Sequence, residues 1–293
     1  TVYSSKEYYN NQSLTRLNAF FIKTMPILFN QYAYPSGDGG WGETWYFVVN
    51  LTDEDLDSNT VTLYINRSIG WVSKIIVTSG INVRVVLTYS SFSGNDIGIR
   101  QFYFETQDAR GYIYRTEISN FTLIKDDVTF EHLFGNSSVY DRSKEDYLNF
   151  SIKVIDADRN QAVGSGRQGI FYITKDGSTF VATNYYYTDL ESRLNLNNIK
   201  VDCSFKVGPQ YWKAGIIDDA WYKTTNSSTY TFTVITKPLE SKLIYPINKS
   251  FLRGIDDITL IANVYDDCGL VSGASVTFNV LPVNYLCKAQ DLG

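Results

Sequence analysis

Hydrophobic and polar residues alternate with a period of two along most of the chain. In residues 147–154, Phe150, Ile152 and Val154 fall on one side and polar or charged residues fall between them. Residues 45–52 follow the same rule, with the apolar side formed by Phe47, Val49 and Leu51. This alternation is typical of a strand with one face in a core and the other in solvent. No segment shows a convincing helical stripe, so the pattern predicts an all-β protein.

The strand pattern recurs at long intervals. The strand at Phe47 leads into Asp53-Glu-Asp55, and a similar strand at Phe150 leads into Asp156-Ala-Asp158 about 100 residues later. A third copy, Leu260-x-Ala262-x-Val264, leads into Asp266-Asp267. The second half of the unit also repeats, as Gly98-x3-Phe102-x-Phe104 and Gly208-x3-Trp212-x-Ala214. A repeat of this length filled with short strands has the size of a Greek-key β-sandwich.

The repeat predicts where domains begin and end. We expect one sandwich over residues 23–125, a second over 126–238 and part of a third over 239–293. Residues 1–22 contain a strand-like segment that resembles the closing strand of a sandwich. Two interpretations of it stay open: it completes a preceding domain, or it is exchanged with a neighbouring subunit.

Eight Asn-x-Ser/Thr sequons are spread along the chain, and none has proline in the middle position. Such a sequon is an acceptor for N-linked glycans in exported proteins. Asn50 and Asn120 fall on predicted solvent faces of strands, where a glycan fits. The candidate glycosylation sites are Asn11, Asn50, Asn66, Asn120, Asn136, Asn149, Asn226 and Asn248.

Composition argues against several kinds of function. A net charge of -5 and a pI near 5.0 disfavour nucleic acid or an anionic membrane as partner, because both need a basic face. No apolar run approaches the roughly 18 residues of a membrane span, and we expect no membrane insertion in this segment. His132 is the sole histidine, which disfavours nucleophilic triads and zinc sites. Paired acids such as Asp218 and Asp219 recur at turns, where Asx-turn roles are expected. We therefore expect no enzymatic activity.

Two groups of residues suggest further chemistry. Asp53, Asp55 and Asp57 crowd one turn and could bind calcium, a cation that takes six to eight oxygen ligands; solvated turn acids are the alternative. Among the three cysteines, Cys203 alternates with apolar residues and is expected to be buried. Cys268 and Cys287 lie in the third unit and could form a disulfide in an oxidising exterior. The glycine-rich loop at residues 36–41 could expose Trp41 for contacts between subunits.

The turn motifs resemble a known class of module. Pro26-x-Leu28, Pro35-Ser-Gly and the Asp108-Ala-Arg-Gly111 turn resemble the Ig-like and PKD-like repeats of archaeal and bacterial surface proteins. The segment with Ile244-Tyr-Pro246 and Val264-Tyr-Asp-Asp-Cys-Gly269 resembles another Ig-like module of those proteins. The second unit departs from the pattern, because Ala214 replaces the second aromatic residue and no glycine follows Asp218.

Together with the sequons, these modules make the chain resemble an archaeal S-layer or related cell-surface glycoprotein. The resemblance implies tandem Ig-like Greek-key β-sandwich domains and an extracellular structural protein that self-assembles into a lattice or sheath. The sequons themselves predict N-linked glycans, and the residues suggest no cofactor other than calcium at the Asp53 turn. Two alternatives remain: an extracellular filament subunit that exchanges residues 1–22, and an adhesin or the carbohydrate-binding stalk of a secreted protein.

Overall fold

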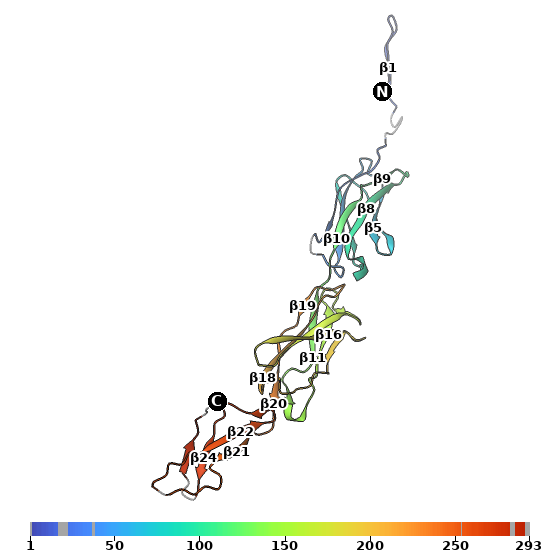
Figure 1. Ribbon diagram of the computed structural model, residues 1–293. Coiled ribbons are helices and arrows are strands. Elements are labelled where there is room, and N and C mark those ends of the chain that lie inside the picture. The colour runs from blue at the N-terminus through green and yellow to red at the C-terminus, as the bar shows by residue number, and fades with distance from the viewer. Residues whose placement is uncertain (1, 17–22, 37–38, 253, 282–284, 291–293) are drawn as a thin grey trace. The chain divides into compact units, whose positions relative to one another are not determined.

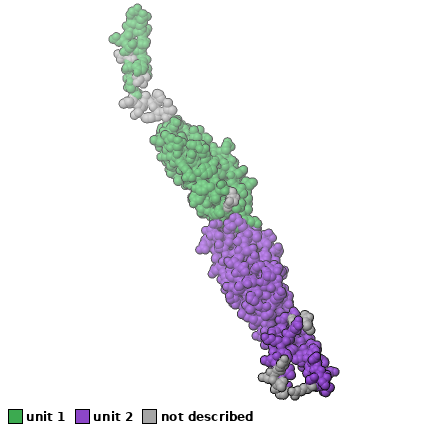
Figure 2. Space-filling model, turned by 90° about the vertical axis from the view of Figure 1, so that its left-hand side faces the viewer, with its two compact units in different colours: residues 1–126 green, residues 127–293 purple. Residues whose placement is uncertain are grey.

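The computed structural model describes residues 2–16, 23–36, 39–252, 254–281 and 285–290. Its regular structure is β-strand, apart from the single 3-10 turns η1 (Gly94–Asp96) and η2 (Arg142–Lys144). The prediction of an all-β fold is confirmed. No helix within these ranges has the length and hydropathy to cross a bilayer. The chain forms two compact units, residues 1–126 and 127–293 (Figures 1 and 2), and each is described by itself.

The first unit contains a two-sheet sandwich, called here the first sandwich. One sheet has the order β3-β4-β7, and the facing sheet has the order β10-β8-β5-β6, with β9 paired to β8. This connectivity, in which the second sheet takes its strands from both halves of the module, is that of an immunoglobulin-type Greek key. The strands are β3 (Ile27–Tyr34), β4 (Trp45–Thr52), β5 (Asn59–Arg67), β6 (Gly70–Thr78), β7 (Val83–Tyr89), β8 (Gly98–Asp108), β9 (Ile113–Arg115) and β10 (Ser119–Leu123).

Aromatic rings fill the space between these two sheets. Phe47 of β4 lies 5.1 Å from Phe102 of β8 and 5.2 Å from Phe121 of β10, measured between ring centroids. Both contacts are edge-on, the geometry that aromatic pairs favour. Phe47, Val49 and Leu51 have no exposed surface, so the inward face expected from the alternation is confirmed.

Residues 39–42 of the glycine-rich segment before β4 pack inward, so the tryptophan among them is not exposed. Trp41 is 5% exposed, so the expectation of an exposed Trp41 is wrong. The reason is that the loop glycines allow close approach: a Cβ at Gly42 would lie within 3 Å of the carboxylate of Asp126. The carbonyl of Gly40 also accepts a hydrogen bond from Trp45 Nε1 at 3.0 Å. Residues 39–42 are therefore part of the domain interior.

The second unit begins with a sandwich of the same connectivity, called here the second sandwich. One sheet has the order β11-β13-β14, with β17 paired to β13; the other has the order β12-β20-β18-β15-β16, with β19 paired to β18. The strands are β11 (Val128–Phe134), β12 (Ser138–Asp141), β13 (Phe150–Asp156), β14 (Gln161–Ala162), β15 (Gln168–Thr174), β16 (Phe180–Tyr187), β17 (Arg193–Leu196), β18 (Gly208–Ile216), β19 (Thr225–Asn226) and β20 (Tyr230–Ile235).

The two sandwiches repeat each other at corresponding positions. Strands β8 and β18 both begin at a glycine with positive φ, 113° at Gly98 and 117° at Gly208, a conformation that favours glycine. Phe150 of β13 stacks on Trp212 of β18 with ring centroids 4.4 Å apart, as the equivalent strands β4 and β8 meet in the first sandwich. Phe150, Ile152 and Val154 are fully buried, which confirms the predicted inward face of that strand.

The second unit also contains a smaller third module. Its sheets are β21-β22-β23 and the hairpin β24-β25. Its core is thin, since Val264 is the one buried apolar residue in the described part of the module. The strands are β21 (Glu240–Tyr245), β22 (Ile261–Asp266), β23 (Gly269–Leu270), β24 (Thr277–Val280) and β25 (Tyr285–Lys288).

The start of the chain forms a separate hairpin of β1 (Val2–Ser4) and β2 (Gln12–Leu14). The side chains of Val2, Tyr3 and Leu14 are 71%, 80% and 71% exposed. The expected closing or exchanged strand over residues 1–22 extends into residues 17–22, which lie outside the described residues, so both of its interpretations stay predictions.

Candidate functional site: the junction of the second sandwich and the third module

A buried arginine marks the contact between the second sandwich and the third module. Arg142 is the first residue of η2, a turn capped by Asp141, whose carboxylate accepts a hydrogen bond from the backbone N–H of Ser143 at 3.0 Å. The local fold thereby directs the Arg142 side chain away from its own turn. Its side chain is 6% exposed, which is unusual for a guanidinium unless its donors are satisfied.

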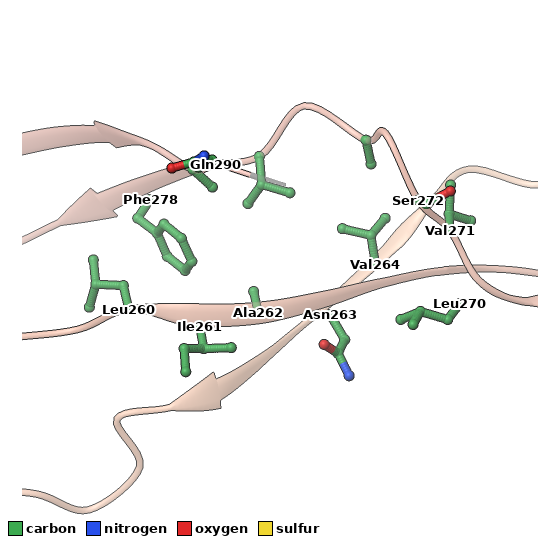
Figure 3. Close-up of a pocket in the computed structure, with 13 residues that line it drawn as sticks. Leu260, Ile261, Ala262, Asn263, Val264, Leu270, Val271, Ser272, Phe278 and Gln290 are labelled. Carbon is green, nitrogen blue, oxygen red and sulfur yellow. The ribbon is translucent and has the colours of Figure 1, made fainter. Parts of the chain in front are cut away.

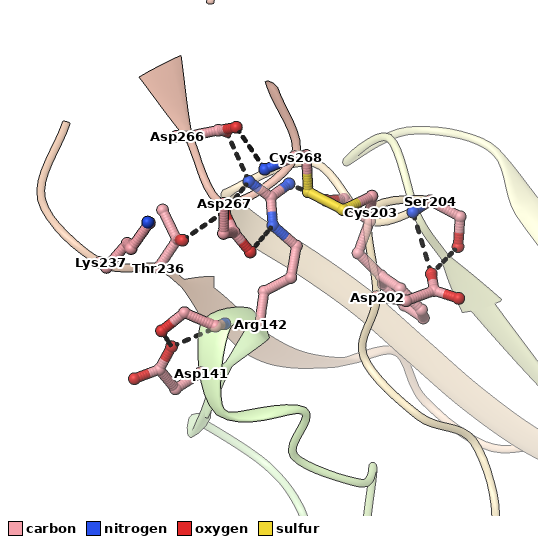
Figure 4. A network of polar contacts seen from close by, with 12 residues as sticks. Asp141, Arg142, Asp202, Cys203, Ser204, Thr236, Lys237, Asp266, Asp267 and Cys268 are labelled. Atoms are coloured by element: carbon pink, nitrogen blue, oxygen red, sulfur yellow. Dashed lines mark hydrogen bonds and ion pairs between the residues drawn. A yellow bond between two sulfur atoms is a disulfide. The ribbon is translucent and has the colours of Figure 1, made fainter. Parts of the chain in front are cut away.

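Arg142 satisfies its donors by bonding to both modules. Its Nε and Nη2 donate to the two carboxylate oxygens of Asp267 at 3.1 and 2.8 Å, a bidentate geometry that suits the planar guanidinium. Nη2 also donates to Asp266 Oδ2 at 2.7 Å, and Nη1 donates to the carbonyl of Phe205 at 2.8 Å. Figure 4 shows the guanidinium beside the two aspartates at the end of β22, Asp266 as its last residue and Asp267 directly after it.

The electrostatics of this cluster are mutually supporting. Hydrogen bonds from Arg142 hold the pKa of Asp267 below its usual value, although partial burial acts in the opposite direction. Hydrogen bonds to Asp267 in turn raise the pKa of Arg142. Thr236, at the start of the linker between the modules, donates its hydroxyl to Asp267 at 2.6 Å. The linker is thus tied to the same carboxylate as the sandwich.

A disulfide crosses the same junction. Cys203 and Cys268 are bonded, with their Cα atoms 5.6 Å apart and a separation of 65 positions in sequence (Figure 4). Both cysteines and Asp267 place ligand-type atoms within 4.8 Å of one another. Because the two sulfurs are bonded to each other and the carboxylate is paired with Arg142, this group is a structural clamp. We call it, with Arg142 and Asp266, the junction clamp.

The expected pairing of Cys268 with Cys287 is wrong, and so is the expected burial of Cys203. Residues around Cys203 form a turn capped by Asp202, whose carboxylate accepts from Ser204 N at 2.9 Å, so strand alternation does not apply there. Cys203 is therefore exposed and available to Cys268. Cys287 lies on β25, in the other sheet of the third module, as a half-buried free thiol.

The acids proposed for calcium have protein partners. Asp53 is 1% exposed and accepts from Asn59 Nδ2 at 2.7 Å, while Asp55 accepts from Thr24 N at 2.8 Å. Asp57 pairs with Lys23 at 3.4 Å and with Arg110 at 3.2 Å. The hydrogen bond from Arg110 is the main reason that the pKa of Asp57 is lowered. Calcium binding at this turn stays a prediction.

The other turn acids make the Asx turns expected of them. Asp266 accepts from Cys268 N at 2.7 Å, and Asp219 accepts from Trp221 N at 2.9 Å, in each case two residues ahead. Asp156 accepts from Arg159 N at 2.9 Å. The single histidine, His132, is half-buried, with its ring 4.7 Å from that of Tyr230 and 6.0 Å from that of Trp212. These contacts are structural.

The eight candidate glycosylation sites all lie within the described residues, and none is buried. Six are exposed, namely Asn11, Asn120, Asn136, Asn149, Asn226 and Asn248. Asn50 and Asn66 are half-buried on strands β4 and β5. Asn136 also accepts a hydrogen bond from Thr231 N at 3.1 Å, so its side chain has a structural role as well.

A cavity of about 250 Å³ lies inside the third module (Figure 3). Ala262 and Val264 of β22 line one side and Phe278 of β24 lines another. Figure 3 shows these side chains pointing into the space between the two sheets. The lining is mostly apolar and belongs to inward strand faces, so the cavity is an incompletely filled core.

Comparisons with known proteins do not assign a family. No family model and no curated protein matches the chain. A tetra-tandem repeat in the extending region of a large adhesion protein is 16% identical with a TM-score of 0.45, covering 87% of this chain and 60% of that one. Red sea bream transglutaminase is 10% identical with a TM-score of 0.30, covering 71% and 31%. Escherichia coli alpha-2-macroglobulin activated by porcine elastase is 10% identical with a TM-score of 0.26, covering 75% and 24%.

Proposed function

We propose that this chain is an extracellular spacer segment of a cell-surface glycoprotein, in which β-sandwich modules hold other parts of the assembly at a set distance. The observation that carries this proposal is the junction clamp. A disulfide and a bidentate arginine at one linker restrict movement between neighbouring modules, which is the property that a spacer needs. The proposed role is structural and not enzymatic.

Two features support an extracellular location. Disulfides persist in oxidising environments and are rare in the cytosol. The bond between Cys203 and Cys268 joins two exposed turns, so it would meet cytosolic reductants directly. The eight sequons, none of them buried, are compatible with N-linked glycans on an exported chain.

A spacer of this kind suits more than one type of assembly. A surface layer or sheath built of this chain would use the spacing as a lattice repeat, and a filament would use the hairpin at the N-terminus as a contact. An adhesin stalk would use the same modules to carry a binding domain outward. The partner in the first two cases is another copy of the chain. Electron microscopy of native material distinguishes a lattice, a fibre and isolated stalks.

The location is tested on intact source cells. An amine-reactive reagent that cannot cross membranes should label the chain, and peptide mapping without reductant should recover the Cys203–Cys268 pair. A chain that is protected from the reagent, with both thiols reduced in samples quenched immediately, would refute the extracellular role.

The spacer role is tested by hydrogen exchange on the full chain. Replacing Cys203 and Cys268 by serine together with Arg142→Met should increase exchange at the linker around residues 236–240 by tenfold or more, while β13 stays protected. Cys287→Ser is the matched control and should leave the linker unchanged. Equal exchange in wild type and the triple variant would show that the clamp does not restrict the junction.

A further inference from the structure

The solvent face of the β10-β8-β5-β6 sheet carries three aromatic rings in contact. Tyr64 and Tyr103 stack with centroids 4.7 Å apart and an interplanar angle of 14°. Trp71 meets Tyr103 edge-on at 5.2 Å, although β5 lies between their strands. The Trp71 side chain therefore extends across β5. Tyr64, Trp71 and Tyr103 are called here the aromatic face, and Trp71 remains 46% exposed on it.

A sequon lies at the edge of this aromatic face. Asn66 of β5 is paired directly with Trp71 of β6 in the strand register. Side chains of directly opposed residues are about 5 Å apart at Cβ, and Tyr64, two residues before Asn66, points to the same side. Asn66 therefore shares the solvent side of the sheet with Trp71, its cross-strand partner, and with Tyr64, its neighbour along β5.

The chemistry of the aromatic face suits a saccharide. A pyranose ring has a face of C–H groups, which is complementary to the electron-rich face of an aromatic ring. Polar groups at the border provide hydrogen bonds for hydroxyls. Arg115 lies over the Tyr103 ring, with its Cζ 3.7 Å from the centroid, and its register partner Glu105 points to the same surface. Trp71, at 46% exposure, is therefore the ring that offers open surface to a saccharide. An exposed aromatic group bordered by polar side chains is the usual character of a binding surface.

We propose that Asn66 carries an N-linked glycan whose first saccharide units stack on the aromatic face, so that this face binds a ligand attached to its own chain. The inference rests on the proposed export of the protein, because the saccharide is supplied outside the cytosol. It goes beyond the proposed function because it gives the glycan on one sequon a defined position against the protein surface.

The attachment is a group transfer from a phosphate-linked saccharide donor. Nδ2 of Asn66 forms a bond to the anomeric carbon, and the bond from that carbon to the phosphate oxygen breaks. The phosphate leaves with the electron pair, and one amide proton passes to solvent. Ser68, the third residue of the sequon, donates its hydroxyl to Asp96 at 2.8 Å in the fold.

The hydrogen bond from Ser68 to Asp96 determines which variants are informative. Ser68→Ala would remove the sequon and also a hydrogen bond to buried Asp96, so its effects would be mixed. Asn66→Gln removes the acceptor and leaves Ser68 intact. The matched control is Asn226→Gln, since Asn226 is an exposed strand residue whose register partner is Gly215, which has no side chain to stack on.

The test combines occupancy and stability in the glycosylated full chain. Mass spectrometry should find a glycan on Asn66. Asn66→Gln should lower the melting temperature of the first sandwich by about 4–8 °C, a shift typical of losing one ring-stacking contact in a small domain. In a Trp71→Thr background, which keeps a strand-forming residue, the same substitution should have little effect. Asn226→Gln should leave the first sandwich unchanged.

Each other outcome overturns the inference in a recognisable way. An unmodified Asn66 beside occupied sequons overturns the docking position but not the proposed function, whereas a chain without any glycan counts against both. If the changes in melting temperature caused by Asn66→Gln and by Trp71→Thr are additive, the glycan on Asn66 is not stacked on the aromatic face. Binding of added chitotriose to the unglycosylated chain without such coupling would assign the aromatic face to a foreign saccharide.

Discussion

Asp96 shows how single residues hold the first sandwich together. Its side chain has no exposed surface, and it accepts hydrogen bonds from Arg67 Nη2 at 2.7 Å, Ser68 N at 2.7 Å and Ser93 N at 2.9 Å. Burial alone would raise the pKa of Asp96, but the hydrogen bonds from Arg67, Ser68 and Ser93 outweigh it and the pKa is lowered. The carboxylate therefore joins the β5–β6 hairpin to η1.

This cluster should make the first sandwich sensitive to acid. The folded pKa of Asp96 lies below the unfolded value of about 3.9, so the unfolded chain binds the proton first and stability falls as the pH drops below about 4. The contribution is fully present at neutral pH. This loss is measured by urea unfolding of the full chain at a series of pH values from 7 to 2. Hydrogen exchange of the β5 amides is the probe that reports on the first sandwich.

Substitutions separate Asp96 from the other carboxylates. Asp96→Ala leaves Arg67 buried without its partner and should destabilise the first sandwich by about 3–5 kcal/mol at pH 7. Its pH dependence should be flatter than that of the wild type. The control Glu54→Gln removes an exposed carboxylate of the same unit and should retain the acid sensitivity. An Asp96 variant with unchanged acid sensitivity would contradict this account.

The roles of some of these charged residues can be predicted from the sequence, and the roles of others cannot. Asp53, Asp219 and Asp266 sit at turns between alternating strands, and their Asx-turn roles follow from local position. Asp96 and Arg142 act through partners that are distant in sequence, so no local pattern marks them. The expected burial of Cys203 is wrong for a related reason. Apolar and polar residues continue to alternate into the turn at Cys203, where the alternation no longer indicates which side chains are buried.

At the scale of single strands, Phe150 is the test of the predicted core. It is fully buried and contacts Trp212 at 4.4 Å, Phe232 at 5.2 Å and Tyr140 at 6.0 Å between ring centroids. Phe150→Ala should destabilise the second sandwich by about 3–5 kcal/mol, from lost burial and the cavity left behind. The change in the free energy of unfolding is measured by urea denaturation, with hydrogen exchange of the β13 amides as the probe of the second sandwich. A loss below about 1 kcal/mol would contradict the assignment of this strand to the core.

The turn after β4 is the place to test calcium. If Asp53, Asp55 and Asp57 bind the cation, EDTA should lower the melting temperature of the first sandwich, and added calcium should restore it. Asp55→Asn should abolish the difference between the two conditions. A melting temperature that EDTA leaves unchanged would restrict these acids to the contacts with Asn59, Thr24, Lys23 and Arg110 described above.

Strands were more predictable than the contacts between them. Burial of alternate residues leaves a period-two signal, and the repeated glycines at Gly98 and Gly208 mark the same strand start in each sandwich. Register and sheet order carry no such signal. Trp41 illustrates the limit: glycines before a tryptophan suit an exposed loop and a tightly packed one equally, and only the approach of Asp126 decides between them.

At the scale of the whole molecule, each unit has its own cores and internal contacts, and the junction clamp is a feature of the second unit. Its components come from three separated stretches, namely η2, the turn at Cys203 and the turn after β22. The repeat pattern predicts that Cys268 and Asp267 belong to the third module, but no local pattern marks their partners. A clamp assembled from such distant positions becomes visible only in the fold.

The bond between Cys203 and Cys268 also determines how the second unit would respond to mechanical tension applied at its two ends. Load entering through the sandwich would pass from Cys203 directly to Cys268, which is 65 positions later in the sequence, and bypass the segment between them. Strands β18 and β20, which complete the second sandwich, lie in that segment, so the covalent path of the load does not run along them. An oxidised chain pulled to full extension would be shorter than a reduced one by roughly 220 Å.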